Sequence, residues 1–229
     1  MKAMLVHGPR DVRLHDLPTP EPGPGEVLVR VRSVGICGSD VHNYVYGEIG
    51  GAVIAEPLSV GHELSGVIAA LGPGVQGPAV GTPVAVDPSI SCGHCELCLE
   101  GDPHICAANR FFGVFPTQGG LREYLVHPAD LVVPLPDKMT FDEGALLEPM
   151  GIAMYVTELA DVRLGDRVAV LGAGPIGLLT IEMALLAGAA QVAATDIVPE
   201  RVVAAKRSGA SEAWNASETD VVKRIWDWT

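Results

Sequence analysis

The chain has 229 residues, of which 48% are hydrophobic, so it can form one large or two ordinary globular domains and is not a disordered protein. Its formal net charge of −13 argues against nucleic acid and anionic membrane surfaces as partners, because neither attracts an acidic protein. The sequence shows no signal peptide and no apolar run of the roughly 20 residues that span a membrane, so we expect a cytoplasmic protein.

Residues 1–150 are predicted to be mostly β-strand. Glu26 to Val34 alternates buried-type valines with more polar residues, which is the period of a strand with one buried face. A turn or short helix is expected at 38–40, capped by Ser39 or Asp40, and a loop at 43–60. Further strands are expected at 2–7, 12–14, 64–71, 83–86, 111–115, 121–126 and 131–134. The many glycine and proline turns between them predict a barrel-like domain, which a helical pattern from Phe141 follows.

From Asp166 the pattern changes to alternating strands and helices. Short apolar runs at 167–171, 191–195 and 212–215 are predicted strands, and helices are expected at 175–187, 199–208 and 219–226. This order favours a right-handed parallel sheet, so the fold class is mixed, with a second domain at 151–229. A doubly wound sheet has a second half beyond its first strand, so we expect only the first half here, with an open apolar edge at 167–171.

Four side chains of the first domain form the ligand mixture of a catalytic zinc site. They are one thiol, one imidazole and two carboxylates: Cys37, His62, Glu63 and Glu148. Asp40 could accept a hydrogen bond from the far nitrogen of His62 and orient it. The alternative is that Cys37 fills the core and His62 is an ordinary buried polar residue. The two carboxylates in apolar surroundings favour a metal, because a buried carboxylate is costly unless it is paired.

A second cluster consists of four closely spaced cysteines in a lobe at 89–109: Cys92, Cys95, Cys98 and Cys106. Two residues separate each of the first three, so four thiolates can close a tetrahedron around a structural zinc ion. Two disulfides or unrelated thiols are the alternative, and clustered cysteines in a chain without an export signal favour the metal. His94 and His104 lie inside the lobe and are alternative ligands, although we interpret them as loop residues.

A glycine fingerprint, Gly172-x-Gly174-x-x-Gly177, follows the predicted strand at 167–171 and begins a helix. Such glycines let the backbone approach a pyrophosphate at the helix N-terminus. Asp196, about 20 residues further on, suits the ribose hydroxyls of NAD and would repel the 2′-phosphate of NADP. NADP is an alternative cofactor, because Arg201 lies near enough in sequence to hold its 2′-phosphate. The alternative for the fingerprint itself is a glycine-rich turn in a sheet that binds no nucleotide.

As a set, these motifs resemble the zinc-containing medium-chain dehydrogenases of the alcohol dehydrogenase superfamily, and within it the sorbitol (L-iditol) and xylitol dehydrogenase branch. The resemblance rests on Val34 to His42, Gly61-His62-Glu63, the four cysteines, Leu147-Glu148-Pro149 and the glycine fingerprint with Asp196. It implies a GroES-like barrel domain with two zinc ions, followed by a partial Rossmann domain that binds NAD. It also implies a small alcohol or polyol substrate and a homo-oligomer in the full-length family.

The resemblance also implies a role for each site residue. Cys37, His62 and Glu63 would hold the catalytic zinc, with Glu148 as a fourth ligand or as the partner of a water molecule on the metal. Ser39 would take the substrate's hydroxyl proton and pass it towards His42, while zinc, as a Lewis acid, lowers the pKa of that hydroxyl so that hydride can leave for the nicotinamide. The cofactor would contact Gly172, Gly174, Ile176, Gly177, Asp196 and Arg201.

Two departures from the family pattern leave alternatives open. The sorbitol branch has a substrate-contacting tyrosine directly after the histidine, where this chain has Asn43, so L-threonine, L-idonate or a simple alcohol are alternative substrates. The family also has a second Rossmann half and returning segments that the 229 residues do not contain, so an N-terminal portion is expected. A truncated chain that binds zinc and NAD without turnover is therefore a rival reading, and a purely structural zinc protein is a third.

Overall fold

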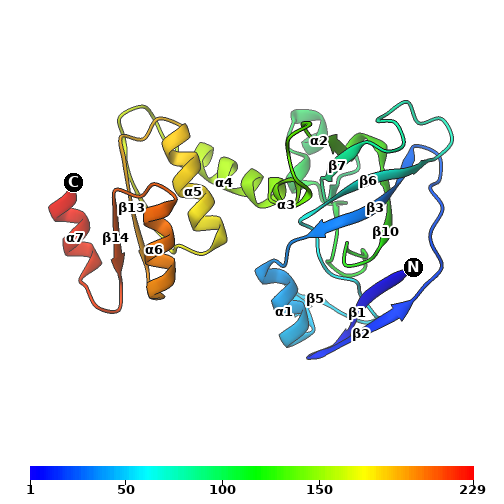
Figure 1. Cartoon of the computed structure of the whole chain (residues 1–229), viewed down its shortest axis with the longest axis horizontal. Coiled ribbons are helices and arrows are strands. Elements are labelled where there is room, and N and C mark those ends of the chain that lie inside the picture. The colour runs from blue at the N-terminus through cyan, green and yellow to red at the C-terminus, as the bar shows by residue number, and fades with distance from the viewer. The chain divides into compact units, whose positions relative to one another are not determined.

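The computed structural model describes all 229 residues, and the chain divides into two compact units, Met1–Glu148 and Pro149–Thr229 (Figure 1). The first unit is built on a five-stranded antiparallel sheet in the order β10-β3-β6-β7-β11. Its strands are β3 (Glu26–Val34), β6 (Leu64–Leu71), β7 (Pro83–Val86), β10 (Tyr124–Pro128) and β11 (Val132–Pro134). The predicted strands at 26–34, 64–71 and 83–86 are confirmed residue for residue.

The hydrophobic core of this unit lies on one face of the sheet. Valines of β3 alternate inward because successive side chains of a strand point to opposite faces, and Val27 and Val29 are fully buried. The other buried members of the cluster are Leu64, Ile68, Val84, Val86, Phe112, Leu125 and Val132.

Shorter elements surround the sheet. The strand pairs are β1 (Lys2–Gly8) with β2 (Asp11–Asp16), β4 (Glu48–Ile49) with β5 (Ala52–Val53), and β8 (Ser89–Ile90) with β9 (Arg110–Phe111). The helices are α1 (Gly38–Tyr46), α2 (Glu96–Glu100) and α3 (Phe141–Ala145), with single 3₁₀ turns at Pro103–Ile105 and Ala129–Leu131.

The expected barrel is not closed. β10 and β11 form the two edges of the five-stranded sheet, and each pairs with one neighbour only. The β1–β2 hairpin joins the rest of the unit through isolated bridges, Ala3 with Arg122 and Val6 with Leu58, rather than through a continuous ladder. A barrel needs every strand to have two neighbours, so the unit is an open sheet with a hairpin against it.

Helix α1 is longer than the sequence suggested. It runs from Gly38 to Tyr46, where a loop was expected from residue 43, and Gly47 ends it in the left-handed conformation. Its N-cap is Cys37 rather than Ser39 or Asp40, and Asp40 occupies the third helical position. The expected loop was wrong because the valines and tyrosines of 41–46 have weak intrinsic helix preference, which tertiary packing overrides.

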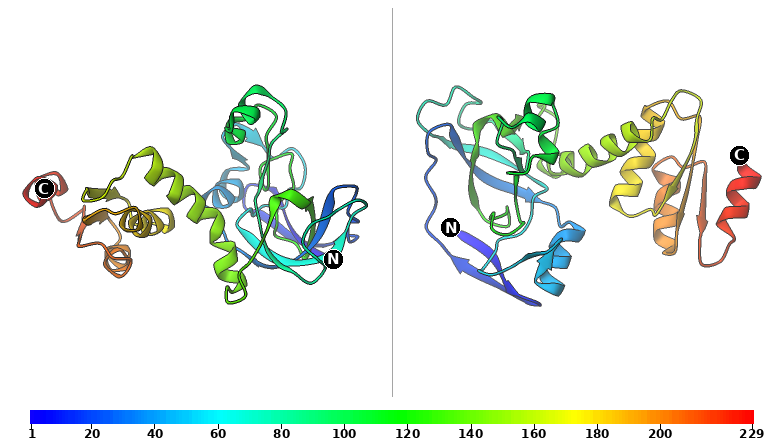
Figure 2. Two further views of the ribbon diagram at one scale, coloured as in Figure 1. Left: turned by 90° about the horizontal axis from the view of Figure 1, so that it is seen from above. Right: turned by 180° about the vertical axis from the view of Figure 1, so that it is seen from behind.

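The second unit has a three-stranded parallel sheet, β12 (Arg167–Leu171), β13 (Gln191–Asp196) and β14 (Glu212–Asn215), in that order. Its helices are α5 (Pro175–Leu186), α6 (Pro199–Arg207), α7 (Val221–Trp228) and all but the first two residues of α4 (Leu147–Leu159), since Leu147 and Glu148 belong to the first unit. Helices α5 and α6 lie side by side against the sheet (Figure 2). None of the chain's helices combines the length and the apolar character needed to cross a membrane.

β12 is an edge strand of this sheet, with β13 as its one partner, and Leu171 at its end is exposed. The buried cluster of the unit consists of Val170, Ala173, Ile181, Ala184, Ala189, Val192, Ala194, Ala205 and Ala210. Many of these residues are alanines, which allow α5 and α6 to pack close to the strands.

His127 is a fully buried histidine of β10 that belongs to no predicted site. Its Nε2 hydrogen-bonds the Asp87 carbonyl oxygen at 2.8 Å, and its ring meets the edge of Phe112. Burial lowers the pKa of His127 to about 4. The bond to Asp87 and the nearby Asp130 carboxylate act to raise this pKa, but the effect of burial is larger. The folded protein therefore holds this imidazole neutral at every pH above about 4.

The buried His127 should make the protein less stable in mild acid. The unfolded chain binds a proton near pH 6.5 and the folded chain only near 4, so stability should fall as the pH drops between these values. The full effect is roughly 3 kcal/mol at 1.36 kcal/mol per pKa unit. His127→Gln cannot titrate, so urea unfolding from pH 7 to 4 should show a shallower loss for the variant. Parallel pH curves for the two proteins would contradict the assignment.

Candidate metal and dinucleotide sites

Cys37, His62 and Glu63 come together at one end of the central strands. Cys37 follows β3, His62 and Glu63 precede β6, and these strands pair directly with Val34 opposite Leu64. This pairing brings two loops that are distant in sequence to the same place. A sulfur, an imidazole nitrogen and a carboxylate oxygen then lie within 4.8 Å of one another.

Asp40 joins the two loops. Its Oδ2 accepts a hydrogen bond from the Cys37 backbone N–H at 2.8 Å, and its Oδ1 accepts one from the Gly61 N–H, also at 2.8 Å. The expected bond to His62 is not formed, because Nδ1 lies 3.9 Å from Oδ1. That prediction was wrong because the two backbone donors take the oxygens, and Nδ1 stays buried without a hydrogen-bond partner.

Two glycines make room for this arrangement. Gly61 has a φ of +92°, a left-handed conformation that side chains disfavour, and it directs the chain into His62. A Cβ on Gly35 would overlap the carboxylate of Glu63, and the Gly35 N–H donates to the Glu63 carbonyl at 2.7 Å. The glycines beside the candidate ligands therefore set where the His62 and Glu63 side chains lie.

The thiol and the imidazole influence each other's ionisation. A hydrogen bond from His62 lowers the pKa of the Cys37 thiol, with a further contribution from Ser39, against the opposing effect of burial. Burial acts to lower the pKa of His62, but the bond with Cys37 and the negative charge of Asp40 outweigh it and raise that pKa overall. The thiolate form, which is the form that binds metals, is thereby favoured at position 37.

Glu148 lies near this group, at the start of α4, without belonging to the three-residue cluster. Burial raises the pKa of Glu148, and the neighbouring Glu63 raises it further while His62 acts in the opposite direction. Neither Glu63 nor Glu148 forms an ion pair with a lysine or arginine. Two half-buried carboxylates beside a thiolate fit a divalent cation, which would compensate their charge.

Ser39 and His42 lie on α1 beyond Cys37. Hydrogen bonds from Ser39 help to lower the pKa of the Cys37 thiol. His42 is exposed, and its ring meets Tyr46 edge-on with centroids 5.3 Å apart. The structure therefore places Ser39 next to the cluster and His42 at the surface of the same helix.

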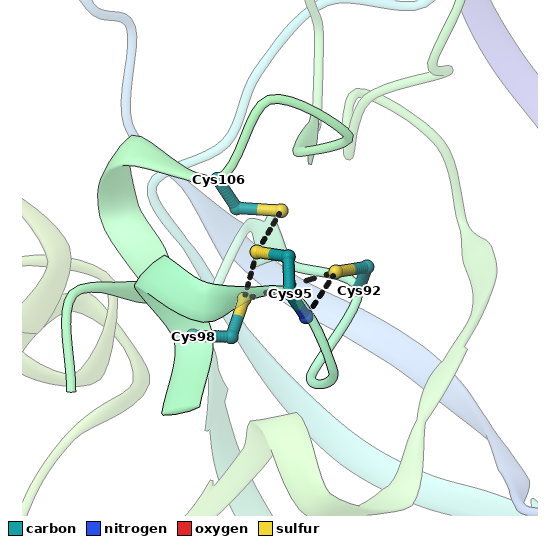
Figure 3. A group of neighbouring side chains, drawn as sticks. All are labelled: Cys92, Cys95, Cys98 and Cys106. Carbon is teal, nitrogen blue, oxygen red and sulfur yellow. Dashed lines mark hydrogen bonds between the residues drawn. The ribbon is translucent and has the colours of Figure 1, made fainter. Parts of the chain in front are cut away.

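The four clustered cysteines point their sulfurs towards a common centre (Figure 3). The Sγ atom of Cys95 lies 3.4 Å from that of Cys98 and 3.8 Å from that of Cys106, and the sulfurs of Cys92 and Cys98 are 3.9 Å apart. These distances are too long for disulfides. They match the spacing of about 3.8 Å between sulfurs that each lie about 2.3 Å from a tetrahedral zinc ion.

The ionisation of these thiols also fits a metal. Hydrogen bonds from the backbone N–H groups of His94 and Cys95 lower the pKa of the Cys92 thiol to about 6. A backbone hydrogen bond involving Cys98 acts to lower the pKa of the Cys95 thiol, but bonds with the neighbouring thiols and burial outweigh it and raise that pKa to about 11. Four crowded thiols resist ionising together unless a cation neutralises them. The Nδ1 of His94 hydrogen-bonds the Cys92 carbonyl at 2.7 Å, which supports its interpretation as a loop residue.

The glycine fingerprint connects β12 to α5. Gly172 has a φ of +101°, and Gly174 is the N-cap of α5. A Cβ on either of them would meet open space, whereas one on Gly177 would overlap the Gly172 carbonyl. The first two glycines thus leave room in front of the helix N-terminus for a phosphate group, and the third permits close packing of helix and turn. Ile176 is partly exposed in the first turn of α5.

Asp196 ends β13 and fixes the glycine-rich turn. Its Oδ1 accepts from the Val198 N–H and its Oδ2 from the Ala173 N–H, each at 2.9 Å. These bonds, together with the Arg201 guanidinium 3.7 Å away, hold the pKa of Asp196 below its usual range. Arg201 is therefore paired with the carboxylate that was expected to select the cofactor.

Sequence reasoning identified Asp40 as a support of His62 but missed its bonds to the Cys37 and Gly61 N–H groups, and it missed Gly35 altogether. The signal for Asp40 was present, since an acidic residue three positions after an N-cap is the spacing of a capping box. It also missed Phe111, whose ring packs edge-on against His62 with centroids 5.1 Å apart. No local pattern could have shown that contact, because Phe111 is distant in sequence.

Comparisons with known families cover most of the chain. Residues 23–137 match the family described as "Alcohol dehydrogenase GroES-like domain", and residues 175–229 match "Zinc-binding dehydrogenase". Among curated proteins, the sorbitol dehydrogenase of Bacillus subtilis is 38% identical over 225 residues, which is 98% of this chain and 64% of that protein. The chain thus spans about 64% of the length of that relative.

Solved structures of dehydrogenases are also similar to this chain. Galactitol-1-phosphate dehydrogenase from Escherichia coli superposes with a TM-score of 0.90 at 36% identity, over 97% of this chain and 63% of that one. The 2R,3R-butanediol dehydrogenase of Bacillus subtilis superposes with a TM-score of 0.89, also at 36% identity, over the whole of this chain and 67% of that one.

Proposed function

Since the chain belongs to the family of zinc-binding alcohol dehydrogenases, we propose that it oxidises a polyol or another secondary alcohol by transferring hydride to NAD. The convergence of Cys37, His62 and Glu63 beside Glu148 is the observation that supports this most directly. A thiol, an imidazole and carboxylates without a basic partner suit a zinc ion that keeps one position for substrate.

We propose that the chain's own residues divide the chemistry as follows. Cys37, His62 and Glu63 would hold the zinc, with Glu148 as a fourth ligand or hydrogen-bond acceptor beside it. Zinc, when bound, supplies a Lewis acid for the substrate oxygen. The Oγ of Ser39 would accept the substrate's hydroxyl proton while donating its own proton towards His42, and exposed His42 would release a proton to solvent. Asp40 positions the Cys37 and His62 loops through its two backbone hydrogen bonds.

The proposed domain roles follow the sequence prediction. Residues 1–150 would form the GroES-like catalytic domain, in which Cys92, Cys95, Cys98 and Cys106 hold a structural zinc in the lobe at 89–109. Residues 151–229 would form the first half of a Rossmann domain, in which the glycines of 172–177 contact NAD, with Ile176 beside them. NAD supplies the hydride acceptor.

A polyol is the substrate class we favour. The relatives named above are called sorbitol and galactitol-1-phosphate dehydrogenases. Asn43 does not argue against this class, because its side chain is buried and its Nδ2 donates to the Gly113 carbonyl oxygen at 3.0 Å.

Two measurements on the purified chain test the proposal: zinc per chain, and NADH formation with sorbitol, xylitol and L-threonine. Two zinc ions with NADH formed from the polyols would support the proposal, whereas faster NADH formation from L-threonine would move the substrate class to an amino alcohol. Zinc and NAD binding without NADH formation would support a non-catalytic binding protein. A single zinc ion would count against the Cys37 site.

Asp196→Ala should change the cofactor preference. Removing the carboxylate removes the acceptor for the ribose hydroxyls and the charge that repels a 2′-phosphate. Charge-assisted hydrogen bonds contribute about 1.5–3 kcal/mol, so the ratio of NADP to NAD dissociation constants should fall by about tenfold or more. Fluorescence titration with both cofactors would measure it.

Arg201→Ala is the matched variant for this test. Arg201 is half-exposed and pairs with Asp196, so its loss should leave NAD binding close to that of the unaltered protein. An unchanged cofactor ratio in Asp196→Ala, or a large loss of NADP binding in Arg201→Ala alone, would contradict the proposed role of Asp196.

A further inference from the structure

His62 lacks the hydrogen bond that usually orients a metal-binding histidine. Such a histidine normally donates its second ring nitrogen to a carboxylate, a carbonyl or water, and this bond fixes the orientation of the ring. Here Nδ1 is buried without a hydrogen-bond partner, 3.9 Å from Asp40 Oδ1. The two hydrogen bonds of Asp40 hold the backbone at Cys37 and Gly61, but they do not orient the imidazole itself.

Phe111 supplies an orienting contact of another kind. Its ring packs against the imidazole of His62 with centroids 5.1 Å apart and planes inclined by 61°, an edge-to-face arrangement that aromatic pairs prefer. His62 is 5% exposed, so the contact is shielded from solvent, and a turn of the imidazole would lose it. The side chain at position 111 therefore restricts the orientations that the His62 ring can adopt beside Cys37 and Glu63.

The segment that carries Phe111 also packs against the backbone around the same cluster. A Cβ on Gly113 would lie 3.0 Å from the Gly61 nitrogen, so the two chain segments are in close contact. The Gly113 carbonyl accepts the hydrogen bond from Asn43 of α1 at 3.0 Å. Phe111 is thus attached to both parts of the chain that carry the candidate ligands, the loop before β6 and the start of α1.

Phe111 is also the last residue in the neck of the lobe at 89–109. The neck consists of strands β8 and β9, in which Ser89 pairs with Phe111, and all four clustered cysteines lie between these strands. Asn109 joins the neck to the thiols, since its Nδ2 donates to Ser89 Oγ at 3.0 Å and its N–H donates to the Cys106 carbonyl at 3.0 Å. A continuous set of contacts therefore leads from Cys106 to the ring that orients His62.

We propose that Phe111 is a positioning residue for the imidazole of His62, and that a metal ion in the four-cysteine lobe strengthens metal binding at Cys37, His62 and Glu63 by holding Phe111 in place. The inference rests on the proposed function, because it takes these three residues to be metal ligands. A metal ion that joins the four thiols removes conformational freedom from the lobe and its neck. By linkage, metal at either site then raises the affinity of the other by the same factor.

The first test measures the zinc affinity of the Cys37 site in variants of Phe111, with the lobe loaded in each. Competition with a chelator gives the dissociation constant, and Cys37→Ala identifies which zinc ion belongs to this site. Phe111→Leu keeps an apolar side chain but loses the aromatic contact, so the site should bind zinc about three- to tenfold more weakly. Phe111→Tyr keeps the ring and should bind zinc as the unaltered protein does.

Phe112→Leu is the matched control. Phe112 is the next residue along the chain, but its side chain lies in the core of the sheet and against His127. The substitution should lower the melting temperature without weakening zinc binding at the Cys37 site. Unchanged affinity in Phe111→Leu, or an equal loss of affinity in Phe112→Leu, would overturn the positioning role.

The second test separates the lobe from the Cys37 site. Cys95→Ser, which empties the lobe, should weaken zinc binding at the Cys37 site by about fivefold or more, the lower end of typical coupling between sites. Asn109→Ala leaves the four thiols intact and removes the side-chain bond to Ser89, so it should retain zinc in the lobe while the Cys37 site binds zinc less tightly. This variant decides the matter if Cys95→Ser does not fold.

The double variant Phe111→Leu/Asn109→Ala tests whether both substitutions act through the same ring. Its loss of affinity should be smaller than the two single losses combined, because Asn109 acts through Phe111. Additive losses, or unchanged affinity in Asn109→Ala, would overturn the coupling. Absence of zinc at the Cys37 site of the unaltered protein would overturn the proposed function as well, whereas equal zinc binding by Phe111→Leu and the unaltered protein would overturn this inference alone.

Discussion

Cys37→Ala should remove one of two zinc ions and reduce NADH formation to below about one thousandth of the unaltered rate, while the fold remains. The thiol is the one soft ligand of its cluster, and alanine offers nothing in its place. The N-cap of α1 should survive, because the backbone N–H at position 37, rather than the sulfur, donates to Asp40. Elemental analysis, turnover and circular dichroism together measure the three effects.

The number of zinc ions per chain tests whether Cys37 is a metal ligand, independently of turnover. Retention of two zinc ions, or undiminished NADH formation, would show that Cys37 is not a ligand of a catalytic metal. If Cys37→Ala loses its circular dichroism signal, the variant has unfolded, and Cys37→Ser then tests ligation in its place. Serine keeps the size of the side chain but is a poor zinc ligand at neutral pH, so Cys37→Ser should stay folded and lose the same zinc ion.

Cys95→Ser should destabilise the protein by several kcal/mol. Its sulfur is near those of both Cys98 and Cys106, so its loss opens the tetrahedron, and structural zinc contributes about 10–16 kcal/mol of apparent binding free energy to the segments it closes. The variant should bind one zinc ion fewer, melt at a lower temperature, and become sensitive to proteases within the lobe at 89–109.

The two cysteine variants serve as controls for each other. Each should lose one zinc ion, but Cys37→Ala should lose mainly activity and Cys95→Ser mainly stability. Stripping zinc from the unaltered protein with a chelator should reproduce the lower melting temperature, and the same treatment should shift Cys95→Ser much less. An unchanged melting temperature for Cys95→Ser would contradict a structural zinc at the four thiols.

The local sequence pattern was sufficient to predict those elements whose position depends mainly on the burial of one face. The alternating valines of Glu26–Val34 predicted β3 to the residue, and the apolar run of Arg167–Leu171 predicted β12 equally well. Burial of a regular face explains both. The spacing of the four cysteines likewise predicted sulfurs that converge, because two-residue separations between the first three leave few other arrangements and the fourth follows after seven residues.

The errors arose where long-range geometry decides. Closure of the barrel depends on whether the β1–β2 hairpin pairs continuously with distant strands, and its two isolated bridges show that it does not. The partner of Asp40 depends on which donors reach it, and Gly61 does so only because β3 and β6 pair with Val34 opposite Leu64. The homo-oligomer and the cytoplasmic location stay predictions.

The double hydrogen bond of Asp40 has a consequence for the order of assembly. It ties the loops of Cys37 and Gly61 with backbone donors, so the entropy of loop closure is lost during folding rather than on metal capture. The hydrogen bonds at the four thiols, such as that from the Cys95 N–H to the Cys92 sulfur at 3.4 Å, join near neighbours in sequence and close no long loop, and the crowded thiols resist ionising together without a cation. Cobalt added to the zinc-free chain should therefore bind at the Cys37 site before the four-cysteine site. Visible absorption during the titration would distinguish the two sites, because the number of thiolate ligands differs between them.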